Sequence, residues 1–203
     1  MSAATVLSGP AGGVAGSKYG ASLIGAGDLV PFDMGGTSTD ISMIVNGEPA
    51  LSSTRGIAGQ RIALQSLDIV SIASGGGSIA RVDAGGILRV GPESAGALPG
   101  PACYGKGGTE VAVTDASVVL GFLDPGNFLG GRETLDVAAA EAALSRLANQ
   151  LSVEPAEAAE GVHKVINTQM AEGIRLVSVR RGVDRENLRF FPSAERQGFI
   201  LRK

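Results

Sequence analysis

The sequence contains no tryptophan, one cysteine and one histidine, and aromatic residues make up only 4% of it. The single cysteine, Cys103, excludes an internal disulfide and fits a reducing compartment. One cysteine and one histidine also exclude a zinc site of ordinary composition. No apolar run approaches the length of a membrane span, and the first residues lack the basic and apolar regions of a signal peptide. These absences predict a cytoplasmic protein that does not bind a membrane.

Charge is also scarce, since charged residues make up 18% of the chain and the net charge is −3. A chain of this charge has no bulk attraction for nucleic acid. Hydrophobic residues reach 44%, which is enough for a core. Glycine is abundant, at 31 of 203 residues, and its clustering in pairs and one triplet predicts many tight turns.

The pattern of apolar residues predicts a β-rich first half and an α-rich second half. Expected strands cover residues 29–33, 41–45, 48–53, 61–73, 79–82 and 87–90, with a hairpin turn at Asn46-Gly47 and an ordered loop over residues 92–108. Expected helices cover residues 8–24, 116–122 with Asp115 as its cap, 137–151 with Asp136 as its cap, and 155–181.

The stretch FDMGGTSTDIS, residues 32–42, indicates a phosphate-binding turn between two strands. A phosphate needs several donors close to one point, and backbone N–H groups supply them where no Cβ blocks the approach. Gly35 and Gly36 meet this requirement, and the hydroxyls of Thr37, Ser38 and Thr39 add further donors.

Acidic residues flank this turn on both sides. Asp33 at the end of the strand could hold Mg²⁺, which prefers carboxylates together with phosphate oxygens. Asp33 or Asp40 could instead orient an attacking group. A plain polar hairpin turn is the alternative, and the P-loop pattern Gly-x-x-x-x-Gly-Lys-Ser/Thr is absent.

Other candidates carry two interpretations each. The Gly75–Gly77 triplet either brings its N–H groups to a phosphate or substrate, with help from Asp68, or forms a simple turn beside a surface carboxylate. Asp115 is either a helix cap or a site residue. A nucleophilic Cys103 is not expected, because its histidine would have to be His163 on the long helix.

Several motifs in order resemble the hydantoinase A/5-oxoprolinase family, over residues 5–184. They are LSGPAGGVAG, FDMGGTSTDIS, LDIVSIASGGGSIARVDAGG, LRVGPESAGALPGPACYGKGGTEVAVTDA and DPGNFLGGR. The DMGGTSTD turn by itself resembles a phosphate motif of the sugar kinase/Hsp70/actin superfamily. The family commonly has a histidine where this chain has Val70, which weakens any proton-transfer role near Asp68.

The resemblance implies an α/β (α+β) fold, namely an incomplete ribonuclease-H-like lobe of the actin/Hsp70/sugar kinase fold with a mixed β-sheet and helices. It implies ATP and Mg²⁺ as cofactors, with Asp33 as the metal ligand. The implied catalytic residues are Asp33, Asp68 and Asp115. The implied cofactor-binding residues are Asp33, Gly35, Gly36, Thr37, Ser38, Thr39, Gly75, Gly76 and Gly77.

The resemblance also implies a function. Family members use ATP to open cyclic amides of the hydantoin or 5-oxoproline type, by phosphorylating the carbonyl oxygen. Residues 1–190 would be a partial ATPase lobe, and residues 191–203 a divergent, disordered tail in which Pro192 interrupts a strand. The chain alone would then be inactive without the missing lobe or a hydantoinase B-type subunit. The alternatives are an inactive remnant or non-catalytic binding module, and a subunit of an ATP-dependent ketone carboxylase.

Overall fold

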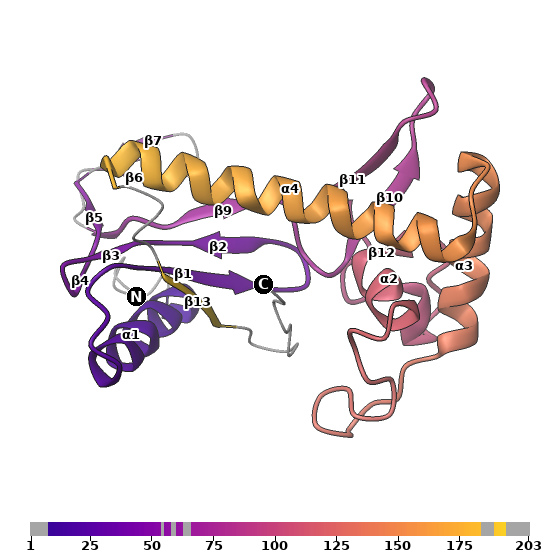
Figure 1. Ribbon diagram of the computed structural model, residues 1–203, viewed down its shortest axis with the longest axis horizontal. Coiled ribbons are helices and arrows are strands. Elements are labelled where there is room, and N and C mark those ends of the chain that lie inside the picture. Colours follow the sequence, from indigo (N-terminus) through magenta and orange to yellow (C-terminus); the bar gives the residue numbers. More distant parts are fainter. Residues whose placement is uncertain (1–7, 54, 58–59, 63–65, 184–188, 194–203) are drawn as a thin grey trace. The chain divides into compact units, whose positions relative to one another are not determined.

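The computed structural model describes residues 8–53, 55–57, 60–62, 66–183 and 189–193, and the chain forms two compact units. Unit 1 consists of Met1–Asp33, Asp40–Ile72 and Glu172–Ser193. Unit 2 consists of Met34–Thr39, Ala73–Ala171 and Ala194–Lys203. Figure 1 labels most of the elements of both units. No helix in the described part of the chain has the length and apolar character needed to cross a membrane.

Unit 1 contains a sheet of short strands with the helix α1 (Ser8–Leu23) packed on it. The strand order is β4 (Glu48–Pro49), β3 (Ile44–Val45), β1 (Leu29–Met34), β2 (Thr39–Ile41) and β9 (Val70–Ile72), and β13 (Arg189–Ser193) also pairs with β1. Val14 and Ala21 of α1 join Leu29 and Ile44 in one buried cluster. The apolar start of β1 therefore lies in the core, which leaves its carboxyl end free to lead into the polar turn.

The predicted hairpin at Asn46-Gly47 is confirmed, with β3 and β4 antiparallel and Val45 opposite Glu48. Both turn residues have positive φ angles, 52° and 77°, as a tight two-residue hairpin turn requires. The strand predicted over residues 41–45 is divided into β2 and β3. The ladder continues across the break, because the Ser42 N–H donates to the carbonyl of Pro31 at 3.0 Å.

Two other strand predictions in unit 1 were too long. Residues 48–53 form β4 and then β5 (Leu51–Ser52), which pairs with β8 (Ser66–Leu67). Residues 61–73 divide among β7 (Gln60–Ile62), β8 and β9, and β7 pairs with β6 (Arg55–Ile57). Residues 63–65, which the long strand would have included, lie outside the described residues.

The expectation that Pro192 interrupts a strand was wrong. β13 runs through Pro192 and pairs in parallel with β1, with Phe32 opposite Pro192 and Asp33 opposite Ser193. Among the described strands β13 pairs only with β1, so it is an edge strand, where proline is tolerated. The proposed domain boundary at residue 190 stays a prediction, and residues 194–203 lie outside the described residues.

Unit 2 combines a three-stranded antiparallel sheet with helices. The strand order is β11 (Leu88–Ser94), β10 (Ser78–Val82) and β12 (Val111–Ala112). α2 (Val113–Val119) and α3 (Val137–Leu151) follow, with a short 3₁₀ turn, η2, at Ala102–Tyr104. A buried cluster joins these elements and consists of Cys103, Val118, Leu123, Phe128, Leu135 and Ala140.

The helix predictions in unit 2 were mostly confirmed. The Asp136 carboxylate accepts a hydrogen bond from Ala139 N at 2.9 Å, so Asp136 caps α3 as expected. α4 (Pro155–Arg181) has the predicted bounds, and the division between the units falls within it, after Ala171. The hairpin of β10 and β11 is also confirmed, but β11 extends to Ser94 and shortens the predicted loop.

The predicted cap of α2 was wrong. α2 begins at Val113 instead of residue 116, and its N-cap position is Ala112. Asp115 therefore lies within the first turn of the helix, where its carboxylate accepts the Ala112 N–H at 2.8 Å. A carboxylate in a helix's first turn also interacts favourably with the helix dipole.

Candidate functional site

The candidate phosphate turn comprises residues 35–38, between β1 and β2, and belongs to unit 2. The Gly35 N–H donates to the Ser38 carbonyl at 2.9 Å and closes the turn. Gly36 and Thr37 are exposed, and within the described part of the chain no acceptor is present for the N–H groups of Gly36, Thr37 and Ser38. The turn thus presents successive open backbone donors at the surface, as an anion site requires.

The glycine triplet supports this turn through backbone hydrogen bonds. The Gly76 N–H donates to the Gly35 carbonyl at 3.0 Å, and the Gly77 N–H donates to the Gly36 carbonyl at 2.6 Å. The Gly75 N–H is also engaged, since it donates to the Ser78 hydroxyl at 2.9 Å. These bonds give the triplet a supporting role, whereas the sequence suggested that its N–H groups reach a phosphate; direct contact with a ligand stays a prediction.

Close backbone packing explains why two of the triplet positions are glycine. A Cβ at Gly75 would lie 2.7 Å from the backbone N and C atoms of Thr37 and 2.8 Å from the Gly35 carbonyl oxygen. A Cβ at Gly77 would lie 2.8 Å from the Gly36 carbonyl oxygen. Any side chain at these positions would push the turn away from the triplet.

Thr39 is placed differently from the other hydroxyl residues of the motif. It is fully buried, and its hydroxyl donates to the Ser74 carbonyl. The Ser74 hydroxyl in turn donates to the Gln169 side chain at 2.8 Å, and Gln169 Nε2 donates to the Val90 carbonyl at 3.0 Å. Thr39 thus ties the end of the turn to the segment before the triplet, while Thr37 is exposed and Ser38 is half-buried.

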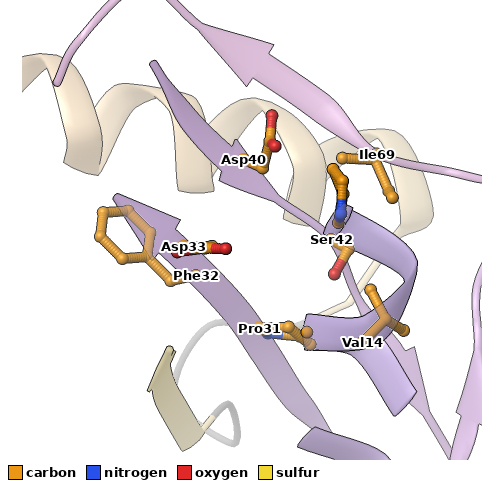
Figure 2. A pocket seen from close by; sticks show the side chains of 9 residues that line it. Val14, Pro31, Phe32, Asp33, Asp40, Ser42 and Ile69 are labelled. Atoms are coloured by element: carbon orange, nitrogen blue, oxygen red, sulfur yellow. The ribbon is translucent and has the colours of Figure 1, made fainter. Parts of the chain in front are cut away.

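Asp33 and Asp40, which flank the turn in sequence, belong to unit 1 and line one small pocket there. Figure 2 shows these carboxylates on the neighbouring strands β1 and β2, with Val14 of α1 and Ser42 also at the pocket. Both aspartates are half-buried, and the Ser71 hydroxyl donates to Asp40. The pocket has room for about one water molecule.

The described residues contain no cluster of three or more histidine, cysteine, aspartate or glutamate side chains able to hold a metal. A magnesium ion does not require such a cluster, because it is commonly bound by one or two carboxylates and by the phosphates of its nucleotide. The half-buried carboxylate of Asp33 at the end of β1 fits that mode of binding.

Asp68 lies in unit 1 and forms an ion pair with Arg181, the last residue of α4. Arg181 Nε donates to the Asp68 carboxylate at 3.1 Å, and the same guanidinium donates to the Leu51 carbonyl at 2.8 Å. Both charged side chains are about one third exposed, at 31% and 32%. The pair connects segments distant in sequence, which is a structural role; the predicted catalytic role of Asp68 stays a prediction.

Asp115 lies in unit 2 and is fully buried. Besides the Ala112 N–H, its carboxylate accepts the N–H groups of Ala102 at 3.2 Å and Cys103 at 2.7 Å. Three backbone donors hold this carboxylate at the junction of η2, β12 and α2. These contacts indicate that Asp115 organises the loop before the helix, and its predicted catalytic role stays a prediction.

Cys103 and His163 do not form a nucleophilic pair. Burial, reinforced by the neighbouring Asp115 carboxylate, raises the pKa of the Cys103 thiol far above its ordinary value, so the thiolate is disfavoured. His163 instead contacts the Ser117 hydroxyl, with Nε2 at 3.0 Å, and the ring of Phe122 edge-on. Burial lowers the pKa of His163.

The sequence missed the residues that hold the triplet in place. Thr114 is fully buried, and both its N–H and its hydroxyl donate to the Gly76 carbonyl at 2.8 Å. The only sequence signal was the position of Thr114 next to Asp115, which drew attention to the carboxylate instead. Gln169 carried no signal beyond its place on a long helix.

The fold and the turn define a mixed α/β lobe of the actin-like ATPase type. Solved structures of the ATP-dependent caprolactamase from Pseudomonas jessenii and of acetone carboxylase each match with a TM-score of 0.82, at 39% and 31% sequence identity. Each match covers 92% of this chain and 27% of the other.

The Hydantoinase/oxoprolinase family model matches residues 1–194, and the chain belongs to this family. Caprolactamase subunit alpha from Pseudomonas jessenii is 42% identical over 180 residues, which is 88% of this chain and 26% of the relative. 5-Oxoprolinase 1 from Arabidopsis thaliana is 43% identical over 202 residues, which is 90% of this chain and 16% of the relative. The chain therefore spans about a quarter or less of these relatives.

Proposed function

We propose that this chain is the phosphate-binding part of an ATP-dependent hydrolase that opens cyclic amides of the hydantoin or 5-oxoproline type. The observation that carries the proposal is the turn at residues 35–38, whose open N–H groups lie at the surface and whose carbonyls are fixed by the triplet. A caprolactamase and a 5-oxoprolinase among the relatives support cyclic amides as the substrate class.

ATP and Mg²⁺ fit the residues present. The N–H groups of Gly36, Thr37 and Ser38, together with the hydroxyls of Thr37 and Ser38, would hold phosphate oxygens. The Asp33 carboxylate would hold the magnesium ion, directly or through water. Bound ATP would supply a phosphoryl group for the amide carbonyl oxygen, which makes the carbonyl carbon more electrophilic.

The contribution of this chain to such a reaction is placement and charge stabilisation. Backbone donors whose directions are fixed before the ligand arrives stabilise negative charge without the cost of reorganising at the moment of reaction. The rest of the cyclic-amide site would come from the missing lobe of the same enzyme or from a hydantoinase B-type subunit. The name caprolactamase subunit alpha supports a multisubunit assembly, and we expect this chain alone to be inactive.

A ketone carboxylase subunit is the second candidate, because acetone carboxylase matches the fold with a TM-score of 0.82. Both candidates use the same phosphate turn, so turn variants cannot distinguish them. The distinguishing assay is ATP hydrolysis by the complete assembly, with a lactam or with a ketone plus bicarbonate as the substrate. An inactive remnant would bind no nucleotide.

The decisive test is Gly36→Ala. A Cβ at Gly36 meets nothing within 4 Å, so the unliganded fold should not change, but the methyl group would block the approach of a phosphate to the turn. Because the added methyl group would hold the phosphate away from these donors, we expect Mg-ATP affinity, measured by calorimetry, to fall about tenfold, which corresponds to about 1.4 kcal/mol. Gly126→Ala is the matched control, because its Cβ would make only an ordinary contact of 3.5 Å with Asp124 in the same unit.

Nuclear magnetic resonance should locate the binding site. Mg-ATP should shift the amide signals of Gly36, Thr37 and Ser38, and Asp33→Ala should remove the magnesium dependence of binding. Absence of heat and of amide shifts at millimolar Mg-ATP would refute the proposal and favour the inactive remnant. Equal binding by Gly36→Ala and the unmodified chain would place the nucleotide elsewhere.

A further inference from the structure

The two open N–H groups at the tip of the turn belong to peptide groups whose carbonyls are already bonded. The Gly35 carbonyl shares a planar trans peptide with the Gly36 N–H, and the Gly36 carbonyl shares one with the Thr37 N–H. Because the N–H and C=O of such a group point in opposite directions, fixing the carbonyl fixes the direction of the N–H. The bonds from Gly76 and Gly77 to these carbonyls therefore aim the open donors away from the triplet.

The same reasoning extends one peptide further, to Thr114. The Gly77 N–H that holds the Gly36 carbonyl shares its peptide with the Gly76 carbonyl, and this carbonyl accepts the Thr114 hydroxyl and N–H, each at 2.8 Å. A continuous series of hydrogen-bonded peptides thus runs from the Thr114 hydroxyl to the Thr37 N–H. Such series polarise their members, so that a donor at the end becomes stronger.

A parallel series ends at the Gly36 N–H but does not contain Thr114. The Ser78 N–H donates to the Gly75 carbonyl at 3.0 Å, and the peptide of this carbonyl carries the Gly76 N–H, which holds the Gly35 carbonyl. The two series make the inference specific. A change at Thr114 acts first on the Gly77 bond and on Thr37, and a change at Ser78 acts first on the Gly76 bond and on Gly36.

We propose that Thr114 is a positioning residue for the phosphate turn, whose hydroxyl orients and polarises the Thr37 N–H through the peptides of Gly77 and Thr37. The inference rests on the proposed function for its ligand, a nucleotide phosphate, but its geometry lies wholly within unit 2. Thr114 is fully buried beneath the triplet, so it acts on the ligand only through these peptides.

Thr114→Val tests the proposal, because it removes the hydroxyl and keeps the β-branched shape and the backbone N–H. Ser117→Ala is the control: Ser117 is equally buried on α2, and its hydroxyl donates to the Val113 carbonyl at 2.9 Å and contacts His163 Nε2 at 3.0 Å, but neither partner belongs to the triplet. Thr114→Ser restores the hydroxyl and should restore the unmodified behaviour.

The first readout is amide hydrogen exchange without nucleotide. Thr114→Val should lower the protection of the Gly77 N–H more than that of the Gly76 N–H, whereas Ser117→Ala should change neither selectively. Equal loss at both amides, or the same pattern in the Ser117 variant, would show a merely structural role and overturn the inference. If the valine variant does not fold, Thr114→Ala is measured against Thr114→Ser by the same criterion.

The second readout is Mg-ATP affinity. We expect Thr114→Val to weaken binding about two- to tenfold, the range for one buried hydrogen bond. Thr114→Ser and Ser117→Ala should bind like the unmodified chain. An unmodified chain that does not bind Mg-ATP would refute the proposed function, while the exchange comparison would still decide whether Thr114 positions the turn. Equal affinities of Thr114→Val and Ser117→Ala in a binding-competent chain would overturn the positioning role alone.

Discussion

A methyl group added at Gly75 should destabilise the candidate phosphate turn, whereas the same group at Gly36 should not. A Cβ at Gly75 would meet backbone atoms of Thr37 at 2.7 Å and the Gly35 carbonyl at 2.8 Å. These separations are well inside ordinary contact distances between non-bonded atoms, about 3.5–4.0 Å for carbon. Backbone atoms cannot rotate away as a side chain can, so the turn or the triplet has to move.

The expected size follows from known costs of overpacking, about 1–3 kcal/mol. Replacing glycine with alanine also restricts the unfolded chain, which offsets about 0.4–1 kcal/mol of that cost. Gly75→Ala should therefore destabilise the protein by up to about 2.6 kcal/mol, with a middle value of about 1.3 kcal/mol. For a chain of this size, each kcal/mol lowers Tm by about 2–4 °C. Gly36→Ala meets no atom within 4 Å, so its Tm should stay the same or rise slightly.

Thermal denaturation followed by circular dichroism measures both variants. Hydrogen exchange at the Gly76 and Gly77 N–H groups adds a local readout, because these groups hold the turn. Gly75→Ala should lower Tm and speed both exchange rates, and Gly36→Ala should do neither. A Gly75→Ala protein as stable as the unmodified chain, with unchanged exchange, would show that the triplet does not pack against the turn.

Three further predictions concern buried or paired side chains. Cys103 should resist iodoacetamide at pH 8 in the folded protein and react in urea, because burial and Asp115 raise its pKa; rapid labelling of folded protein would contradict this. Burial lowers the pKa of His163, so the unfolded chain binds the proton more readily. The contribution of neutral His163 to the free energy of unfolding should be fully present above the pKa of histidine in the unfolded chain, about 6.5. It should fall as the pH drops below that value, by no more than about 1.4 kcal/mol per pH unit. His163→Gln should weaken the dependence of the free energy of unfolding on pH in this range, as measured by urea denaturation. An unchanged dependence would mean that another group causes it. Arg181→Ala and Asp68→Ala should each destabilise the protein, and their double-mutant cycle should give a coupling of about 0.2–1 kcal/mol, reduced by solvent exposure; a coupling of zero would remove the pair's structural role.

The sequence predicted well the long elements and those with a clear cap or turn residue. α4 has the predicted bounds because its apolar residues recur at helical spacing over many turns, and α3 begins where Asp136 supplies a cap. The Asn46-Gly47 hairpin was found because few residue pairs suit that turn. Short strands such as β4 and β5 were merged, since two or three residues do not establish an alternation that a sequence can reveal.

The sequence identified the exposed turn but not the internal arrangement of the residues around it, and phosphate binding at the turn stays a prediction. Gly36 and Thr37 lie exposed on the turn, as the motif suggested. Thr39, by contrast, turns its hydroxyl inward to Ser74, and Asp115 holds three backbone N–H groups instead of capping a helix from outside. Ser74 lies 35 residues from Thr39, and Ala102 and Cys103 lie 13 and 12 residues from Asp115, so local patterns carried no information about these partners.

The glycines of the site show why that limit has a physical origin. A glycine can be required because a ligand approaches the backbone or because another segment of the protein does. Both requirements select glycine, so the sequence does not distinguish them. The structure separates them. A Cβ at Gly36 would meet nothing, so the unliganded protein gives no packing reason for glycine there. A Cβ at Gly75 would meet the turn itself, which explains that glycine without any ligand. A bound ligand would account for the glycine at Gly36, whereas packing against the turn accounts for the glycine at Gly75.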